Sequence, residues 1–403
     1  MAISEWLQNI ALLILVYAIR MNKLALFHNY EINKEHHPNP LPNFNCQLAK
    51  GFVEGKYMAS EDVEIDYENK LAFVSVGLRN NNKGLHKLWS KQQPSQVDAD
   101  FTGVYVYHDI EKIDEPVKIP IPDSSPHGLS LFRLEDKQHI RVFLTSHERT
   151  TSSGNTAGQE EIIYFDYNFL EKSVKNGKFS RVSDPTGKIL WASNDLVATT
   201  KNSLIVSQYL PFRDALENEW KSSLLTLLTL TDYTAISYVE FEEPGAETEQ
   251  IQINPERSKI IANYIPFANG IQYSYQTRRI YVNHFTKSRT ALYHWNHLFP
   301  TEPCKADKYI TYGKGFFPDN LNFDENKKFL YVAGTNNIGR TAFIKKSLDF
   351  DSVILKVSVE DHTWEPIYED RTGEKTLSVA AKVSENKFLL GSFFKNLYVC
   401  GVE

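Results

Sequence analysis

The chain has 403 residues, 42% of them hydrophobic and 13% aromatic, with 44 basic and 50 acidic side chains and a formal charge of -6. A chain of this length and apolar content can bury a large core, as one large β-domain or as two ordinary domains. The charge is nearly balanced and no basic stripe is interleaved with aromatic residues, so the sequence predicts no nucleic-acid partner.

An apolar run, Ile10–Ile19, lies near the N-terminus. It has the length of the hydrophobic part of a secretory signal and is short for a spanning helix, and no small-residue cleavage site follows it. We expect residues 1–28 to form a signal or retained anchor helix, which places the protein in the secretory pathway, membrane-associated or extracellular or luminal. The flanking charges disagree with this placement: Glu5 precedes the run and Arg20 and Lys23 follow it, which by the positive-inside rule would favour a cytoplasmic C-terminal side. The alternative is an amphipathic helix packed on the domain.

Residues 29–45 are polar and are expected to form a linker to a single domain over residues 46–403. From Cys46 onward, short β-like runs alternate with Gly, Pro, Asn and Asp, a pattern typical of a sandwich, barrel or propeller. The runs include Leu71–Val76, Gly103–Tyr107, Ile140–Thr145, Ile162–Phe165, Ser203–Val206, Arg279–Val282, Phe329–Val332, Val353–Val357 and Phe388–Leu390. One helix is expected at Asp214–Trp220, which has acidic residues in its first turn.

Paired oxygen-bearing side chains stand at the start of two of these runs. Glu61 and Asp62 directly precede a β-like run that contains Val63 and Ile65, and Asn194 and Asp195 directly precede Leu196–Thr199. Successive side chains of a strand point to opposite sides, so each pair can serve two ions but cannot easily grip one. Carboxylate and amide oxygens are the ligands that calcium takes. The doublets therefore predict two calcium ions.

Six polar positions recur at intervals of roughly sixty residues, each just before or within a β-like run. They are Glu61, His127, Asn194, Asn269, Asp319 and a position near Ser378. The interval fits propeller blades with long loops, and six positions imply six blades that each send one residue into a central tunnel.

The three cysteines bear on the compartment. Cys46 opens the globular part and Cys400 nearly ends the chain, so a bridge between them would close almost all of it into one loop and leave Cys304 as the odd thiol. In a reducing compartment all three would be free.

Five segments in order resemble the serum paraoxonase/arylesterase family, a six-bladed β-propeller of calcium-dependent lactonases and esterases. The segments are Ser60–Asp62, Ser125–Leu129, Ser193–Asp195, Phe267–Ile271 and Pro318–Asn320, and the resemblance runs from Asn45 to Tyr398. It implies an all-β fold with a central calcium tunnel, an N-terminal apolar helix and one or two short helices over the active site.

The resemblance also implies roles for particular residues. The catalytic calcium would be held by Glu61, Asn194, Asn269, Asp319 and Asn320, and a structural calcium by Asp62, Asp195 and the backbone carbonyl of Leu129. His127, with His147 behind it, would deprotonate water, or a calcium-binding carboxylate such as Asp319 would act as the base. Arg79, Phe267 and Phe393 would line the substrate wall.

Three functions follow as hypotheses. The first is a calcium-dependent hydrolase of small lactones and aryl esters, in which the metal polarises the carbonyl. The second is a membrane-anchored accessory or chaperone protein with the same propeller and little or no turnover, as among the paraoxonase-like proteins that assist ion-channel assembly. The third, a metal-free propeller that binds sugars or peptides, requires the oxygen ligands to be coincidental.

Overall fold

The computed structural model describes residues 41, 44–54, 56, 58–77, 101–147, 149–150, 156–157, 160–210, 234–243, 250–313, 315–336 and 350–402. The expected N-terminal helix, most of the linker, the helix at Asp214–Trp220 and Arg79 lie outside these residues. In the part of the chain that is described, no helix is long and apolar enough to span a membrane.

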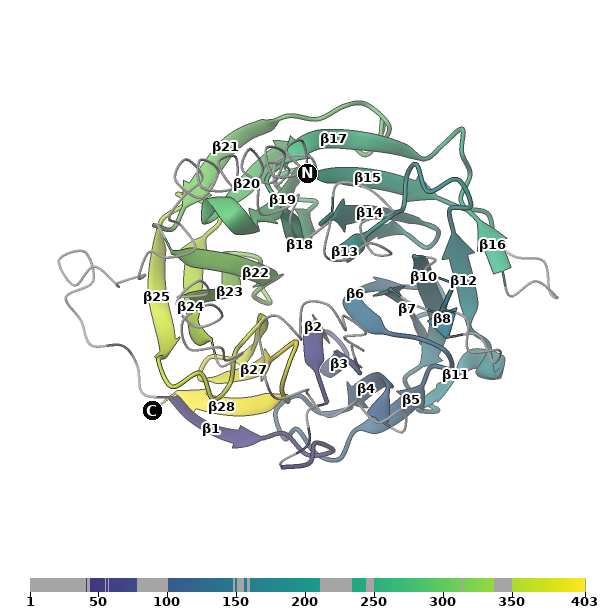
Figure 1. The fold of residues 1–403 in the computed structure, drawn as a ribbon. Coiled ribbons are helices and arrows are strands. Elements are labelled where there is room, and N and C mark those ends of the chain that lie inside the picture. Colours follow the sequence, from purple (N-terminus) through teal and green to yellow (C-terminus); the bar gives the residue numbers. More distant parts are fainter. Residues whose placement is uncertain are drawn as a thin grey trace, which may run out of the picture.

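The strands form six sheets arranged in a ring (Figure 1). The first blade contains β2 (Ser60–Asp66), β3 (Leu71–Val76), β4 (Gly103–Tyr107) and β5 (Val117–Pro120). The second contains β6 (Pro126–Arg133), β7 (His139–Ser146), β10 (Glu161–Asn168) and β12 (Ser180–Ser183), with β11 (Ser173–Val174) beside β10. The third contains β13 (Ser193–Thr200), β14 (Ser203–Gln208), β15 (Thr234–Glu240) and β17 (Lys259–Ile265).

The other three blades repeat this order. The fourth contains β18 (Ala268–Ser274), β19 (Arg279–His284), β20 (Arg289–His294) and β21 (Ala306–Thr311). The fifth contains β22 (Phe316–Phe323), β23 (Phe329–Asn336), β24 (Asp351–Ser358) and β25 (Trp364–Asp370). The sixth contains β26 (Val379–Ser384), β27 (Lys387–Gly391), β28 (Tyr398–Val402) and β1 (Phe44–Leu48). Smaller elements are the strand pair β8 (Arg149–Thr150) and β9 (Thr156–Ala157) and the 3-10 helices η4 (Lys175–Gly177) and η6 (Phe285–Lys287).

The predicted all-β, six-bladed propeller is confirmed. The innermost strands are β2, β6, β13, β18, β22 and β26, and each contacts the next around the ring. A separate buried apolar cluster fills each of the six spaces between neighbouring blades. Strands between two such clusters are buried on both faces, which is why all six residues of β3 are buried and read as a nearly continuous apolar run.

The ring is closed by strands from the two ends of the described chain. β1 lies beside β28 in Figure 1 and pairs with it antiparallel, with Cys46 in register with Cys400. The two cysteines form a disulfide with a sequence separation of 354 residues, which confirms the predicted bridge. Cys304 is the free cysteine of the described residues.

A second connection joins the second and third blades at the outer edge of the ring. β16 (Gln250–Gln252) follows β15 of the third blade in the chain, but it pairs parallel with β12 of the second blade. Figure 1 shows β16 outside β12. Because this strand belongs to one blade by sequence and to another by pairing, it fixes the two blades to each other.

Candidate functional site

Five of the six innermost strands interrupt their pairing register near their first residues. The breaks fall between Ser60 and Val63, Pro126 and Leu129, Ser193 and Leu196, Ala268 and Ile271, and Pro318 and Leu321. The residues inside these breaks are Glu61–Asp62, His127–Gly128, Asn194–Asp195, Asn269–Gly270 and Asp319–Asn320. The five sequence motifs are thus five bulge-like irregularities, which re-aim side chains that a regular strand would alternate.

Hydrogen bonds join these irregularities from blade to blade. Leu129 N–H donates to Asp62 Oδ2 (2.7 Å), and Ile271 N–H donates to Asp195 Oδ2 (2.8 Å). Thr145 Oγ1 donates to the Asn194 carbonyl (3.0 Å). The sixth blade takes part through Ser378, whose hydroxyl donates to the Glu61 carbonyl (2.9 Å). These bonds hold the motif residues of neighbouring blades in fixed positions around the tunnel.

Two glycines allow this close approach. A Cβ at Gly128 would lie 2.5 Å from Asp195 Cα, and one at Gly270 would lie 2.6 Å from Asn320 Cα. Both clashes are with backbone atoms, which cannot move aside as the end of a flexible side chain could. The glycines in the Pro-His-Gly and Ala-Asn-Gly segments are therefore required by the spacing of the blades.

Buried oxygen atoms without partners gather at this ring. Glu61 Oε2 and the Oδ1 atoms of Asn194, Asn269 and Asn320 are buried and accept no hydrogen bond within the described structure. An unsatisfied buried acceptor costs about 1–3 kcal/mol, and native structures seldom leave several together without a bound ion or water. These four residues belong to the five expected ligands of the catalytic calcium, and the fifth, Asp319, is also buried. Oxygen-only donors of this kind fit a calcium ion.

Two carboxyl groups at the ring, Glu61 and Asp319, are buried and repel one another when both are ionised. Burial raises the pKa of Glu61 to about 8, opposed by a hydrogen bond from Asn320 and by the charge of His147. Burial, and then repulsion from Glu61, raise the pKa of Asp319 well above its usual value. Among the described residues neither carboxylate pairs with Lys or Arg. Buried like charges of this kind are relieved by protons or by a cation.

The amide oxygens are essential to any such cation site. Within the described ranges, no group of three or more His, Cys, Asp or Glu side chains is placed to hold a metal ion by itself. The candidate site therefore depends on Asn194, Asn269 and Asn320 to complete its ligands.

The second expected calcium site has a different character. Asp62 Oδ1 accepts the N–H of Val63 (2.8 Å), and Asp195 Oδ1 accepts the N–H of Leu196 (2.7 Å). With the two inter-blade bonds above, each carboxylate oxygen of Asp62 and Asp195 has a backbone donor. Burial is the largest cause of two pKa shifts here: it raises the pKa of Asp62 to about 8 and the pKa of Asp195 well above its usual value. Leu129 contacts Asp62 through its N–H group. Unlike the residues of the first site, Asp62 and Asp195 have no carboxylate oxygen without a hydrogen-bond partner among the described residues.

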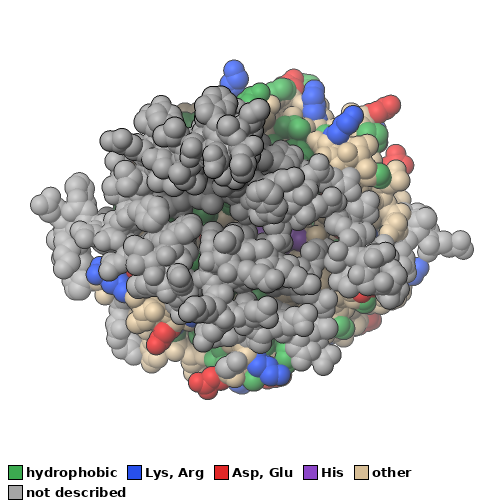
Figure 2. All heavy atoms as spheres, viewed as in Figure 1, with side chains coloured by type: hydrophobic (Ala, Val, Ile, Leu, Met, Phe, Trp, Pro, Cys, Tyr) green, Lys and Arg blue, Asp and Glu red, His purple; other side chains and the backbone are tan. Residues whose placement is uncertain are grey.

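The two predicted histidines lie together beside Glu61. His127 Nε2 is 3.2 Å from Glu61 Oε1, and His127 Nδ1 is hydrogen-bonded to His147 Nε2. Burial lowers the pKa of His127 well below its usual value, as does the neighbouring His147, whereas Glu160 opposes the shift. A neutral imidazole with one nitrogen directed toward this circle of buried carboxylate and amide oxygens can serve as a general base. Figure 2 shows histidine surface near the centre of the ring.

Two residues at this site were missed by the sequence analysis. Glu160 Oε1 lies 3.0 Å from His147 Nδ1, on the side away from His127. Tyr209 packs its ring against both imidazoles, with centroids 6.4 Å from His127 and 5.7 Å from His147. A signal for Glu160 was present, because Glu160–Glu161 is an acidic doublet directly before a β-like run, as Glu61–Asp62 is. Tyr209 has no comparable signal.

The aromatic wall extends from Tyr209 across three blades. Phe267 lies 5.7 Å from Tyr209, Phe285 lies 5.1 Å from Phe267, and Phe317 lies 5.3 Å from Phe285, as ring centroids. We call these four residues the aromatic row. Phe267 is the expected wall residue that the structure brings to the row. Phe393, the other described residue expected at the substrate wall, packs on Phe394, with ring centroids 3.8 Å apart.

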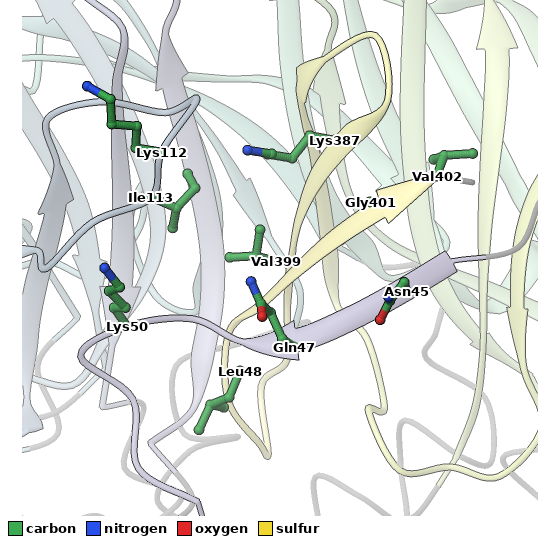
Figure 3. Close-up of a pocket in the computed structure, with 10 residues that line it drawn as sticks. All are labelled: Asn45, Gln47, Leu48, Lys50, Lys112, Ile113, Lys387, Val399, Gly401 and Val402. Carbon is green, nitrogen blue, oxygen red and sulfur yellow. The ribbon is translucent and has the colours of Figure 1, made fainter.

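A pocket elsewhere on the surface does not belong to this site. It has a volume of about 370 Å³ and lies between β1, β28 and the turn after β4 (Figure 3). Three lysines line it, but Lys50 pairs with Asp114 (2.9 Å) and Lys112 with Asp109 (2.9 Å), and Lys387 donates to the Glu111 carbonyl. None of the motif residues contributes to its lining.

Comparison with known proteins supports the resemblance seen in the motifs. No family model matches the sequence. Human serum paraoxonase/arylesterase 1 is 24% identical over 398 residues, covering 94% of this chain and 96% of that protein. Rat serum paraoxonase/arylesterase 2 is 23% identical over 390 residues, covering 94% of each.

Among solved structures, a luciferin-regenerating enzyme superposes with a TM-score of 0.50 at 12% identity, covering 89% of this chain and 95% of that one. That likeness concerns the fold alone. The sequence relationship extends over 94% of the chain. The chain is therefore similar in sequence to serum paraoxonase/arylesterases 1 and 2 over nearly its whole length.

Proposed function

We propose that this protein is a calcium-dependent hydrolase of lactones and aryl esters. The observation that supports the proposal is that four residues of the five inner-strand irregularities each bury a side-chain oxygen without a hydrogen-bond partner, with His127 3.2 Å from one of them, Glu61. Relatives named paraoxonase/arylesterase, aligned over 94% of the chain, make an ester-type bond the first substrate class to test.

The metal would be held by Glu61, Asn194, Asn269, Asp319 and Asn320. Two carboxylates balance the charge of a divalent ion, and three amides add neutral oxygens, which leaves coordination positions for water and substrate. When bound, calcium would supply Lewis-acid polarisation of the ester carbonyl. A second, structural calcium at Asp62, Asp195 and the Leu129 carbonyl is part of the proposal.

The proton transfer falls to the histidines. His127 Nε2 faces Glu61 and is the imidazole nitrogen available to a water molecule at the ring. The water would lose a proton to His127 Nε2 as its oxygen attacks the carbonyl carbon, and His147 would share the positive charge through its hydrogen bond to His127. Asp319, a buried carboxylate with a raised pKa, is the alternative base.

The aromatic row gives the substrate an apolar side. Tyr209 contacts both histidines, and Phe267 and Phe285 continue the surface while remaining partly exposed. An aryl or alkyl group packed there would place the ester carbonyl toward the oxygen ligands. Apolar walls with a few placed polar groups are the usual form of such pockets.

The disulfide indicates the compartment. Disulfides form and persist mainly in oxidising environments, so Cys46–Cys400 supports passage through the secretory pathway. We propose that the protein is extracellular, luminal or membrane-associated, with the apolar N-terminal run as its targeting or anchoring segment.

The deciding experiment assays the purified full-length protein against a panel of lactones and aryl esters. Activity should disappear in excess chelator and return with calcium but not with an equal concentration of magnesium, which demands tighter octahedral geometry. Asn269→Ala and Asp319→Ala should each abolish turnover in excess calcium. Full activity in excess chelator, or no hydrolysis of any member of the panel by calcium-loaded protein, would rule the proposal out.

A further inference from the structure

Three side chains form one hydrogen-bonded line that ends on Glu160. The line runs from His127 on β6 through His147 after β7 to Glu160, the residue before β10, and Glu61 Oε1 on β2 lies 3.2 Å from the outer nitrogen of His127. Glu160 is 6% exposed, and its two oxygens have separate partners. Oε1 accepts from His147 Nδ1 (3.0 Å), and Oε2 accepts the N–H of Ser193 (3.2 Å).

The donors in this line follow from the chemistry of each group. An ionised carboxylate can only accept, so the ring nitrogen of His147 that faces Glu160 must carry a hydrogen. In the neutral state of His147, hydrogen on Nδ1 leaves Nε2 bare, so that Nε2 can only accept. His127 must then donate from Nδ1, which leaves His127 Nε2 without a hydrogen on the side that faces Glu61.

We infer that Glu160 is a positioning residue that sets the proton arrangement of the histidine pair. By holding hydrogen on His147 Nδ1, it makes His127 Nε2 the nitrogen with a free electron pair. When water transfers a proton to His127 Nε2, the Nδ1 proton of His127 can move to His147 Nε2, and the Glu160 carboxylate balances the resulting positive charge. The rate consequence rests on the proposed hydrolase function, whereas the proton arrangement does not.

The second contact of Glu160 makes the arrangement specific for a carboxylate. Ser193 begins β13 and directly precedes Asn194, so the Ser193 N–H fixes Glu160 against the third blade. A glutamine has one acceptor oxygen, and two hydrogens face this position, one from Ser193 and one from His147. If the glutamine oxygen accepts from Ser193, its NH₂ group faces His147 Nδ1 and requires the opposite tautomer.

The substitution Glu160→Gln therefore keeps the size of the side chain and reverses the direction of hydrogen-bond donation between the two histidines. His147 would carry hydrogen on Nε2 and donate to His127 Nδ1, and His127 would carry hydrogen on Nε2. His127 would then have no free electron pair on the side of the ring. Orienting a histidine tautomer with a carboxylate contributes up to about 10⁴-fold in the rate of serine proteases.

The chain offers a matched control one residue away. Glu161 is also buried, and its carboxylate pairs with Arg181 (2.7 Å). Glu161→Gln removes a buried carboxylate from the same strand end without changing the hydrogen-bonded line. Glu160→Asp keeps the carboxylate and shortens the side chain, so it tests the chemistry of the group against its reach.

The first measurement is independent of activity. Nitrogen-15 spectra of calcium-loaded, histidine-labelled protein report which imidazole nitrogens carry hydrogen, and His147→Gln identifies the signals of that residue. We expect hydrogen on Nδ1 of both histidines in the wild type and in Glu161→Gln, and on Nε2 of both in Glu160→Gln. The same tautomers in Glu160→Gln as in the wild type would overturn the inference.

The second measurement is steady-state kinetics on the best substrate of the panel. We expect Glu160→Gln to lower kcat by roughly 10²-fold or more with little change in KM, because general-base assistance contributes about 10²–10⁴-fold. Glu160→Asp should recover part of the loss, and Glu161→Gln should stay within about twofold of the wild type. Equal kcat values for Glu160→Gln and Glu161→Gln would contradict the inference. A wild type with the expected tautomers but no hydrolysis would overturn only the proposed function.

Discussion

Asn320 of the fifth blade is hydrogen-bonded to Glu61 of the first blade, although the sixth blade lies between them in the ring. Its Nδ2 donates both to the Glu61 carbonyl (3.1 Å) and to Glu61 Oε1 (3.0 Å), which orients the carboxylate and leaves Glu61 Oε2 buried without a partner. The same amide presents its own Oδ1, also partnerless, to the ring. One asparagine thus positions a charged oxygen and supplies a neutral one.

Removing this amide should weaken metal binding as well as stability. Asn320→Ala loses both hydrogen bonds and one proposed ligand, so we expect calcium to bind roughly 10- to 100-fold more weakly. Asn322 is the matched control, because it lies on the same strand and its Nδ2 donates to the Val63 carbonyl (3.0 Å). Both variants should lose about 1–3 kcal/mol in unfolding free energy without calcium. Calorimetric calcium titration should separate them, and equal calcium affinities would contradict the ligand role of Asn320.

A methyl group at Gly128 should disrupt the ring. Its Cβ would meet backbone atoms of Asn194 and Asp195 at 2.5–2.7 Å, so Gly128→Ala must push the second and third blades apart. We expect a loss of about 1–3 kcal/mol in unfolding free energy, the usual cost of overpacking, together with weaker calcium binding. Gly401→Ala is the control, since nothing lies within 4 Å of its added Cβ. Thermal unfolding that is equal for the two variants would show that the blades can separate there without cost.

The propeller and most of the ring were predictable because each blade contributes a local signal. The motifs at Glu61, His127, Asn194, Asn269 and Asp319 recur at blade spacing, and their polar residues interrupt otherwise apolar runs. Ser378, the sixth position, also reaches the ring, through its bond to the Glu61 carbonyl. These features depend on the residues of one short segment at a time.

What the sequence did not reveal depends on contacts between distant segments. The bulge-like geometry at Asn194 requires the neighbouring Gly128, which lies in another blade. The parallel pairing of β16 with β12 has no local pattern, because a three-residue strand can pair with any open edge. Glu160 directly precedes a β-like run, and its contacts become visible only when the fold brings His147 and Ser193 beside it.

The disulfide should contribute to stability through ring closure. Replacing Cys46 and Cys400 together by serine removes the covalent link between β1 and β28, so we expect a loss of about 2–5 kcal/mol in unfolding free energy. Cys304→Ser is the control, since Cys304 is not in a disulfide. Chemical denaturation with and without a reducing agent measures the effect, and the double variant should not respond to reduction. A wild type that reduction leaves equally stable would show that strand pairing alone closes the ring.

His284 should make the fourth blade sensitive to acid. Burial, and then the charges of Arg289 and Lys287, lower the pKa of His284 from 6.5 to about 3, and Arg289 Nε donates to its Nδ1 (3.2 Å). Below pH 6.5, His284 therefore binds a proton in the unfolded chain and stays unprotonated in the native state until the pH approaches 3. This contribution to stability is complete above pH 6.5 and declines by up to about 1.4 kcal/mol per pH unit as the pH falls toward 3.

Glutamine at this position can accept from Arg289 and donate to the Tyr293 hydroxyl, which His284 Nε2 now meets at 3.1 Å, and it does not titrate. Comparing His284→Gln with the wild type at each pH, in excess calcium, cancels the contribution of the acidic residues that both proteins share. We expect the unfolding free energies of the two proteins to converge as the pH falls below 6.5. His294→Gln, an exposed histidine on the same blade, should follow the wild type throughout. Parallel curves for His284→Gln and the wild type between pH 6.5 and 4 would mean that His284 is protonated in the native state, because only a difference in proton binding between the native and unfolded states can change their separation.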